Sequence, residues 1–511
     1  MKNINLKFLN YKKILELIPN PFVFFNKYMK FVKNVDFKLI INKKVITLII
    51  SSIFFLFVLF LSIPGLYDLG RVQKVLTEAI NKEINLDISL TPDIEYRIFP
   101  QPYFHVKDAK IFNNNKSGVN SEIAEIKNLK IYIKISNFFN KDNIHIKKIG
   151  ISDANFFIKN DTIKFIRLFF TQKFPQKNLF IKKSKLFFND DEDKTLFIYT
   201  INKSNFQNLT KNKSQKFVSN GEFFNLPAKF EWEKNTDSKS IILKLNLSKI
   251  SVSFLNKIEI KNGKYEYENN LRVLTNEFKT KYNFEENSIK LYSNSSFIKN
   301  IPLTYNGSIN IKPFYFDINF KPKKFDLSYF LKNTNFFNEL FLNKILIHEN
   351  LNGLINIKSE NLVKAKVFEK IDLFVSFKEG GLSLDNTTLS SKKIGDIVIQ
   401  ESKFVENENS IFLLGKILFK VNNLKEFQKY FLIPKNLRKD FKEIEINFSL
   451  NTSNDEFKIY NIFFYDLNKK KIESKNIGEF LTNNTINKKD ILSPIFFRNF
   501  LTQVFSSYFV G

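Results

Sequence analysis

The residues of this chain that could do chemistry are few and scattered. The three histidines, His105, His145 and His348, lie far apart, and the first two alternate with apolar residues, which predicts exposed strand positions rather than metal ligands. The acidic run at 190–193 lacks the glycine and the spaced ligands of a calcium loop, so a solvated turn is the better interpretation. Without cysteine, the chain has no thiol nucleophile, disulfide or thiolate metal site.

No catalytic motif connects these residues. The sequence contains no H-E-x-x-H, no G-x-S-x-G, no phosphate-binding loop and no Rossmann glycine pattern. We therefore predict a protein that is not an enzyme and that uses neither a metal nor a cofactor. Its function must come from its surfaces.

The net charge of +28 raises the question of a nucleic-acid partner. The lysines are spread along the whole chain, mostly in alternation with apolar residues, and no Arg-rich arm or zinc-finger spacing is present. We predict that nucleic acid is not a partner. A solvated lysine face is the simplest interpretation, and attraction to anionic lipid headgroups is the second.

One segment is apolar enough to cross a membrane. Val45–Ile63 is a 19-residue run without charge, close to the roughly 20 residues that span a bilayer. A long preceding region and the lack of a small-residue cleavage site favour an uncleaved anchor over a signal peptide. The positions predicted to lie in the membrane are Val45, Leu48, Phe54, Phe57, Leu61 and Ile63.

The charge around this run predicts its orientation. Residues 1–44 carry ten lysines against Glu16 and Asp36, so this end is predicted to be cytoplasmic. Apolar clusters in the arm allow it to lie along the membrane surface, and a disordered tail explains it equally well. The predicted organisation is a basic cytoplasmic arm at 1–44, a transmembrane helix at 45–63, a β-rich domain at 64–490 and a C-terminal amphipathic helix at 491–511.

The elements beyond the anchor are predicted to be mostly strands. An amphipathic helix comes first, with apolar residues at helical spacing from Leu66 to Ile84. Segments with period-two alternation follow, and Asn262-Gly263 joins two of them as a hairpin turn; Asn306-Gly307 and Asn352-Gly353 carry the same signal. After this first helix, further helices are predicted at Phe336–Ile347, at Leu424–Phe431 and after Ser493-Pro494.

This pattern predicts a mainly β fold, a long curled antiparallel sheet with one apolar and one wet face. So many strands would aggregate as a flat sheet, so they must form either packed sandwiches or an open trough lined by the apolar face. Periodicity does not choose between these two. The residues predicted to lie on the apolar face are Phe104, Val106, Leu129, Ile131, Ile133, Ile258, Ile260, Phe314, Phe316, Ile318, Leu382, Leu384, Ile397 and Ile399.

The C-terminal helix has two interpretations. Its apolar residues recur every three to four positions, which favours a helix packed on the sheet. A helix that touches a membrane or ends the groove is the alternative. The residues that carry the pattern are Phe496, Phe500, Leu501, Val504, Phe505 and Tyr508.

The order of these features resembles a known family. After the anchor and amphipathic helix, Ile98–Ala109 resembles a strand pair of the AsmA family of Gram-negative envelope proteins, and 124–135 and 144–157 resemble its next strands. Residues 300–420 resemble it more loosely through Tyr305–Ile311, Phe325–Leu331 and Leu351–Ile355. The family is related to TamB and YhdP and, more distantly, to eukaryotic bridge-like lipid transfer proteins.

The resemblance implies a function. It implies a single-pass inner-membrane anchor and a periplasmic apolar β groove that holds phospholipid acyl chains, supports lipid transport to the outer membrane and maintains its integrity. The implied partners are membrane phospholipids and envelope proteins. The alternative is a scaffold for outer-membrane protein biogenesis, whose free strand edges would pair with a client.

Overall fold

The computed structural model divides after Tyr67 into two units, which are described separately. The residues that the structure describes are 43–84, 87–113, 121–137, 144–159, 178–189, 195–209, 213–235, 237, 240–261, 264–285, 287–311, 313–332, 334–363, 367–407, 410–454, 456–473, 477–482, 486–487 and 494–509. The predicted basic arm, apart from its last two residues, and the acidic run at 190–193 lie outside these ranges, as does Ser493.

The first unit contains one apolar helix, α3 (Lys43–Ser62), followed by the short 3-10 helix η2 (Ile63–Leu66). Residues 46–66 are long and apolar enough to cross a membrane, as expected from the sequence. Most of the described side chains of α3 are exposed, with Leu48 at 70% and Phe54 at 61%. Pro64 lacks a backbone N–H, which explains why the α-helix does not continue through it.

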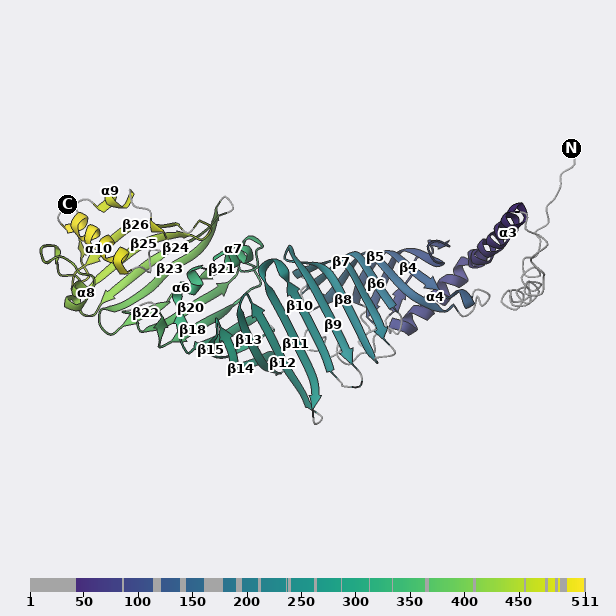
Figure 1. Ribbon diagram of the computed structural model, residues 1–511, viewed down its shortest axis with the longest axis horizontal. Helices are drawn as coiled ribbons and strands as arrows, with labels where there is room; N and C mark the ends of the chain where they lie inside the picture. The colour runs from purple at the N-terminus through teal and green to yellow at the C-terminus, as the bar shows by residue number, and fades with distance from the viewer. Residues whose placement is uncertain are drawn as a thin grey trace. The chain divides into compact units, whose positions relative to one another are not determined.

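The second unit begins with α4 (Leu69–Ile84), the predicted amphipathic helix, and continues as strands (Figure 1). The strands of its first half are β1 (Asp87–Ser89), β2 (Ile94–Arg97), β3 (Tyr103–Asn113), β4 (Ser121–Ile133), β5 (Ile146–Lys159), β6 (Asn178–Asn189), β7 (Thr195–Leu209), β8 (Ser214–Phe223), β9 (Leu226–Asn235), β10 (Ser240–Leu247), β11 (Val252–Lys261), β12 (Lys264–Val273), β13 (Asn276–Phe284), β14 (Ser288–Ile298), β15 (Ile301–Asn310) and β16 (Tyr315–Pro322).

The second half mixes strands with short helices. Its strands are β17 (Phe325–Asp326), β18 (Gly353–Ser359), β19 (Leu362–Val363), β20 (Lys370–Lys378), β21 (Gly381–Ser383), β22 (Thr388–Ser391), β23 (Gly395–Asn407), β24 (Ser410–Val421), β25 (Glu443–Asn451), β26 (Glu456–Tyr465), β27 (Lys471–Ile472) and β28 (Ile486–Asn487). Its helices are α6 (Leu327–Lys332), α7 (Thr334–Leu342), α8 (Leu424–Tyr430), α9 (Ile477–Thr482) and α10 (Pro494–Phe509), with the 3-10 turn η6 (Lys435–Leu437); η3 (Ile135–Asn137) and η5 (Ser248–Ile250) precede them.

Apart from β17 and β19, which pair in a separate two-stranded sheet, these strands form one long sheet that does not close, which confirms the mainly β class. Most neighbours in sequence are antiparallel neighbours in the sheet, and the colour in Figure 1 accordingly changes steadily along it. The sheet is nevertheless mixed, because β5 pairs with β6 and β16 pairs with β18 in parallel. A parallel pair needs a crossover between its strands, and α6 and α7 lie in the second of these crossovers.

Two of the three Asn-Gly turn predictions were wrong. Gly307 lies within β15, where a Cβ atom would sit 2.3 Å from the backbone oxygen of Asp317 on β16. Gly353 begins β18 beneath the ring of Phe316, so it also serves close strand packing. Asn262-Gly263 lies outside the described residues, but Lys261 pairs with Lys264 as a two-residue hairpin requires.

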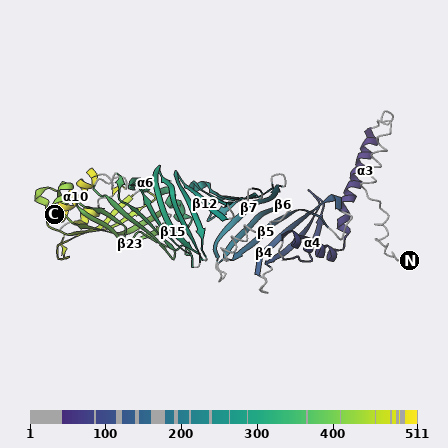
Figure 2. The same ribbon diagram turned by 90° about the horizontal axis from the view of Figure 1, so that it is seen from below.

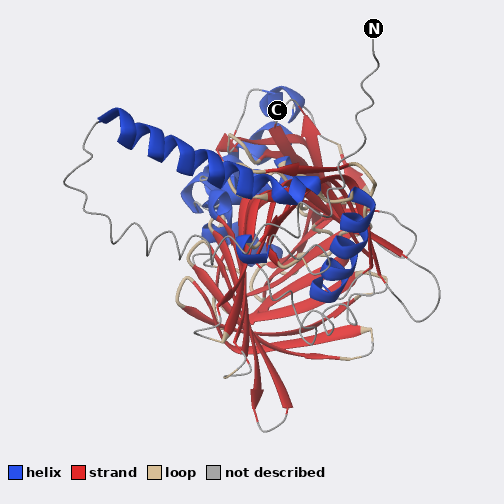
Figure 3. Ribbon diagram, turned by 90° about the vertical axis from the view of Figure 1, so that its right-hand side faces the viewer, coloured by secondary structure: helices blue, strands red, loops and turns tan. Residues whose placement is uncertain are grey.

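The helices cover the two ends of the sheet. At the start, α4 lies beside the first strands in both Figure 1 and Figure 2, and its Val72, Leu76 and Ile80 are buried. At the end, α8 and α10 join one apolar cluster with β24–β26 (Figure 1). In the nearly end-on view of Figure 3 the strands of this unit follow a curved surface. The predicted helices at 336–347 and 424–431 correspond to α7 and α8, whereas α6 and α9 were not predicted.

Candidate functional site

The two faces of the sheet differ sharply in chemistry. On β9 and β10, Trp232 pairs with Leu243, and Leu245 pairs with Phe230, so these side chains share a side, here called the apolar face. The alternate residues point to the opposite, charged face, as side chains on a strand must. On that face neighbouring residues form ion pairs, such as Lys257 with Glu259 at 2.5 Å.

The apolar face is fully covered near α4. Phe104 and Val106 on β3 pair with Ile131 and Leu129 on β4, and all four side chains are at most 1% exposed. Ile133 at the end of β4 is 6% exposed. These five predicted lipid contacts therefore lie on the predicted face but form packed core in this structure. Contact between them and a lipid stays a prediction.

The same face is more open in the middle of the sheet. Ile258 is buried and Ile260 is half-buried on β11. On β12 and β13, hydrophobic residues of the apolar face are only half-buried, among them Tyr267, Leu271, Val273, Phe278 and Tyr282. Phe316 is 9% exposed and Ile318 half-buried, whereas Phe314 precedes β16 and is 41% exposed, so it is a turn residue rather than part of the strand.

The last predicted positions lie toward the C-terminal cover. Leu382 on β21 is 8% exposed and belongs to a cluster with Phe316 and Phe377. Leu384 and Ile397 pack against the cluster that α8 and α10 complete, and Ile399 is half-buried on β23. The C-terminal helix packs as the first interpretation predicted, because the cluster includes its Phe500, Leu501, Val504, Phe505 and Tyr508, with Phe496 against it.

Helix α7 ties distant strands together. Its Phe336 and Leu340 pack on Leu226, Ala228, Leu247 and Ile250 at one end of β9 and β10. Its Asn338 donates a 2.8 Å hydrogen bond to the carbonyl of Thr452 after β25, and the Thr452 hydroxyl donates one of 2.6 Å to the Asn338 side chain. Lys249 pairs with Glu339 at 2.8 Å. A short helix thus connects β9–β10 to the turn after β25, far along the sheet.

A row of polar side chains crosses the apolar face in its middle part. Asn256 accepts a 2.8 Å hydrogen bond from the Tyr282 hydroxyl, and burial raises the pKa of Tyr282 to about 12. Thr280 and Tyr305 hydrogen-bond through their hydroxyls, and so do Ser293 and a second serine, Ser296, at 2.6 Å. Because these groups satisfy one another, the row leaves the face neutral and hydrogen-bonded.

Comparison with known proteins finds a family that resembles the first part of the chain. Residues 42–163 match the model of the AsmA family. This stretch is therefore similar to the AsmA family. No curated protein matches the chain. Among solved structures, the crystal structure of a sex pheromone staph-cAM373 precursor aligns with 63% of this chain and 92% of its own at 8% identity; its TM-score of 0.12 is too low to say anything of the fold.

The AsmA-family stretch runs from α3 through β5 and so contains the apolar helix, α4 and the covered part of the sheet. The looser resemblance at 300–420 lies outside it and stays a prediction. One expectation within the stretch was wrong, because His105 is 6% exposed rather than solvated. Its Nε2 lies 3.0 Å from Asn128 Oδ1, and its Nδ1 lies 3.8 Å from a Glu95 oxygen, so neighbouring strands enclose it.

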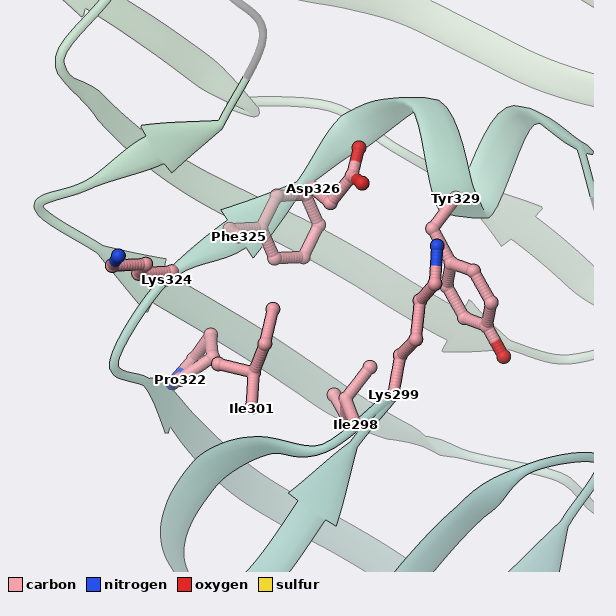
Figure 4. A pocket seen from close by; sticks show the side chains of 8 residues that line it. All are labelled: Ile298, Lys299, Ile301, Pro322, Lys324, Phe325, Asp326 and Tyr329. Carbon is pink, nitrogen blue, oxygen red and sulfur yellow. The ribbon is translucent and has the colours of Figure 1, made fainter.

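One pocket within the part of the chain that the structure describes is small. It lies between β14–β16 and α6 and is lined by Ile298, Ile301, Phe325 and Tyr329, among others (Figure 4). Its free space of about 10 Å³ is enough for one water molecule and too small for an acyl chain. Among the described residues no group of His, Asp and Glu could hold a metal ion. The open apolar face is therefore the feature best suited to a ligand.

Proposed function

We propose that this protein holds phospholipid acyl chains on the apolar face of its sheet and supports lipid transport to, and integrity of, the outer membrane. In this proposal α3 anchors the chain in the inner membrane, with the N-terminus cytoplasmic and the sheet in the periplasm. Similarity to the AsmA family at 42–163 supports an envelope function. The observation that carries the proposal is the half-exposed apolar face of β12 and β13, opposite a face of ion pairs.

The physical reason is the hydrophobic effect. An acyl chain laid on this face removes its own methylene groups from water, which is worth about 0.8 kcal/mol for each CH₂ that is buried. The half-buried side chains around Leu271 and Phe278 would lose their remaining exposure in the same step. Because the face continues across neighbouring strands, a chain can move along it without a large barrier. Binding of this kind requires no catalytic group.

The scaffold alternative receives less support from the edges of the sheet. A client strand would add to an exposed edge with unpaired backbone groups. At one end β3 already pairs with the short strands β1 and β2, and at the other β26 pairs with β27 and β28. Short strands at an edge are a common way to prevent strand addition. We therefore favour the lipid proposal.

A photo-crosslinking experiment tests the proposal in intact cells. Phe278 is replaced by p-benzoylphenylalanine, which places a photoreactive ring on the apolar face of β13. After irradiation, the full-length protein is purified and analysed by mass spectrometry for covalently attached phospholipid. We expect a lipid adduct at this position.

The neighbouring residue provides the matched control. Lys279 lies next in β13 and is exposed on the charged face, so the same photoreactive residue there should give no lipid adduct. Equal adducts at positions 278 and 279 would show only nearness to a membrane. No adduct at Phe278 would contradict the proposal directly.

A further inference from the structure

One lysine lies on the apolar face of the sheet, whereas the neighbouring lysines lie on the charged face. Lys234 on β9 pairs with Gln215 on β8 and with Ile241 on β10, and it lies two residues after the fully buried Trp232. Its side chain is therefore on the apolar face. Within the described strands β8–β16, Lys234 is the one charged residue whose register places it there. The other lysines of these strands alternate onto the charged face.

The surroundings of Lys234 are apolar on one side and polar on the other. Trp232, Ile241 and Ile258 form a buried cluster on its apolar side. Across β8 and β7, the row continues with Gln215 and Asn208, which pair with each other and are half-buried. Side chains paired in this way have Cβ atoms about 4.5–5.5 Å apart, so one ammonium and two amides can act on the same small group.

Burial affects the ammonium group itself. Lys234 is half-buried, and desolvation lowers the pKa of its amine from the ordinary range. Because an apolar setting disfavours the cation, a charge at this position carries a cost that a neutral residue would avoid. The same desolvation strengthens any attraction between the ammonium and an anion that reaches it.

Aromatic residues mark the same edge of the sheet. Tyr265, Tyr267, Tyr282 and Phe284 gather near the ends of β11–β14, with ring centroids 5.0–6.1 Å apart. Tyr267 lies in the cross-strand row that starts at Lys234 and passes through Ile241 and Ile258. The last residues of β9 and β11 are at the lower edge of the sheet in Figure 1. Tyrosines suit the level where acyl chains meet headgroups, since the ring is apolar and the hydroxyl polar.

We propose that Lys234, with Gln215 and Asn208, binds the phosphate of a phospholipid whose acyl chains lie on the apolar face beside Trp232 and Ile258. This inference rests on the proposed function and deepens it by fixing where the headgroup sits. The lipid would lie with its head at the edge formed by the ends of β7–β9 and its tails toward the middle of the sheet. The occupant is a phosphate-bearing lipid, because an ammonium and two amides at the end of an apolar row match a phosphate joined to acyl chains.

The test compares two lipids that differ only in the headgroup. The full-length protein is reconstituted into phosphatidylcholine liposomes that contain phosphatidylglycerol or diacylglycerol, each with the same photoreactive acyl chain. The crosslinked fraction is measured for each lipid, and their ratio is the readout. We expect the native chain to favour phosphatidylglycerol and Lys234→Gln to reduce that ratio about fivefold, the upper range for a partly exposed ion pair.

Matched variants isolate the role of this lysine. Lys234→Arg keeps the charge and should retain most of the preference. Lys244→Gln removes an exposed charge from the charged face of the adjacent β10 and should leave the ratio unchanged. Thermal unfolding of each variant checks that it folds, so that a loss of crosslinking is not a loss of structure.

The possible outcomes separate this inference from the function on which it rests. Crosslinking of both lipids with the same ratio in the native chain and in Lys234→Gln would overturn the headgroup site but leave acyl-chain binding intact. An equal drop in Lys244→Gln would assign the preference to general surface charge and also overturn it. Failure of the native chain to crosslink either lipid would count against the proposed function itself.

Discussion

The apolar face under α4 and the apolar face of β12 and β13 come from the same alternation of residues, yet they differ in exposure. On β3 and β4 the side chains of Phe104 and Ile131 are completely buried, and α4 contributes its own buried Leu76 and Ile80. On β12 and β13 the corresponding Leu271 and Phe278 are only half-buried. A helix from the chain covers one part of the sheet, whereas the other part offers its surface to a ligand.

Because of this difference, substitutions in the covered part should change stability, and substitutions in the half-exposed part should change binding. Where the face is covered, each apolar side chain contributes to folding, and a change there acts on the free energy of unfolding. Where the face is half-exposed, folding gains less from each side chain, and a change acts on whatever lies on the surface. Four substitutions test this difference.

The largest effect is expected for Ile131→Asp in the covered part. An unpaired carboxylate at a fully buried position should destabilise the fold by about 4 kcal/mol or more, well above an ordinary substitution. Thermal unfolding followed by circular dichroism measures this loss. Lys127→Asp, at an exposed position on the same strand, is the control and should unfold close to the native temperature. Similar unfolding temperatures for the native chain and Ile131→Asp would remove the distinction between the two parts.

The second effect is expected for Leu271→Asp in the half-exposed part. This carboxylate keeps partial access to water, so the loss of stability should stay below about 2 kcal/mol. A charge beside Phe278, its cross-strand partner, should instead repel an acyl chain and reduce the lipid adduct at position 278 about tenfold or more. Arg272→Ala on the charged face serves as the control. An unchanged adduct in Leu271→Asp would mean that lipid does not lie on this strand face.

The third effect concerns α7, which connects strands on both sides of the half-exposed part. Asn338→Leu removes both hydrogen bonds between this side chain and Thr452 and should cost about 1–3 kcal/mol, because both residues are buried. Thr452→Val should cost a similar amount. The double variant should lose less than the sum of the two, and this coupling, measured from denaturant unfolding, reports the contact itself. Strict additivity would show that α7 does not hold these strands together.

The sequence predicts the faces well but not their exposure. Alternation places Ile131 and Ile258 on strand faces and predicts a mainly β sheet, because a period of two follows from strand geometry alone. Whether a side chain is then covered depends on α4, α7 or α10 packing over it, and those contacts join residues far apart in sequence. Gly307 was mistaken for a turn for the same reason, since the backbone that requires a glycine belongs to the next strand.

Lys234 shows what the alternation could have revealed. In β9 the residues Phe230, Trp232 and Lys234 occupy successive positions of one face, so the charge at the end of an apolar row is visible in the sequence. The sequence does not show that this charge is exceptional, because lysine is frequent throughout the chain. Only the strand register of β8–β16 shows that the other lysines of this region lie on the opposite side. A lysine that departs from the alternation can therefore be recognised only after the alternating residues have been assigned to the two faces of the sheet.

The smallest effect is expected on the charged side of the covered part. Hydrogen bonds from Arg97 and then from Lys107 hold the pKa of Glu95 at about 2, below its ordinary 4.5. A lowered folded-state pKa stabilises the fold at pH values above 4.5, and this contribution is lost as the pH falls toward about 2. Glu95→Gln should therefore lower the unfolding temperature slightly at neutral pH, and the difference from the native chain should vanish near pH 2. The effect stays small because the ion pair is exposed to solvent. A difference that persisted at pH 2 would mean that Glu95 acts through packing against His105 rather than through its charge.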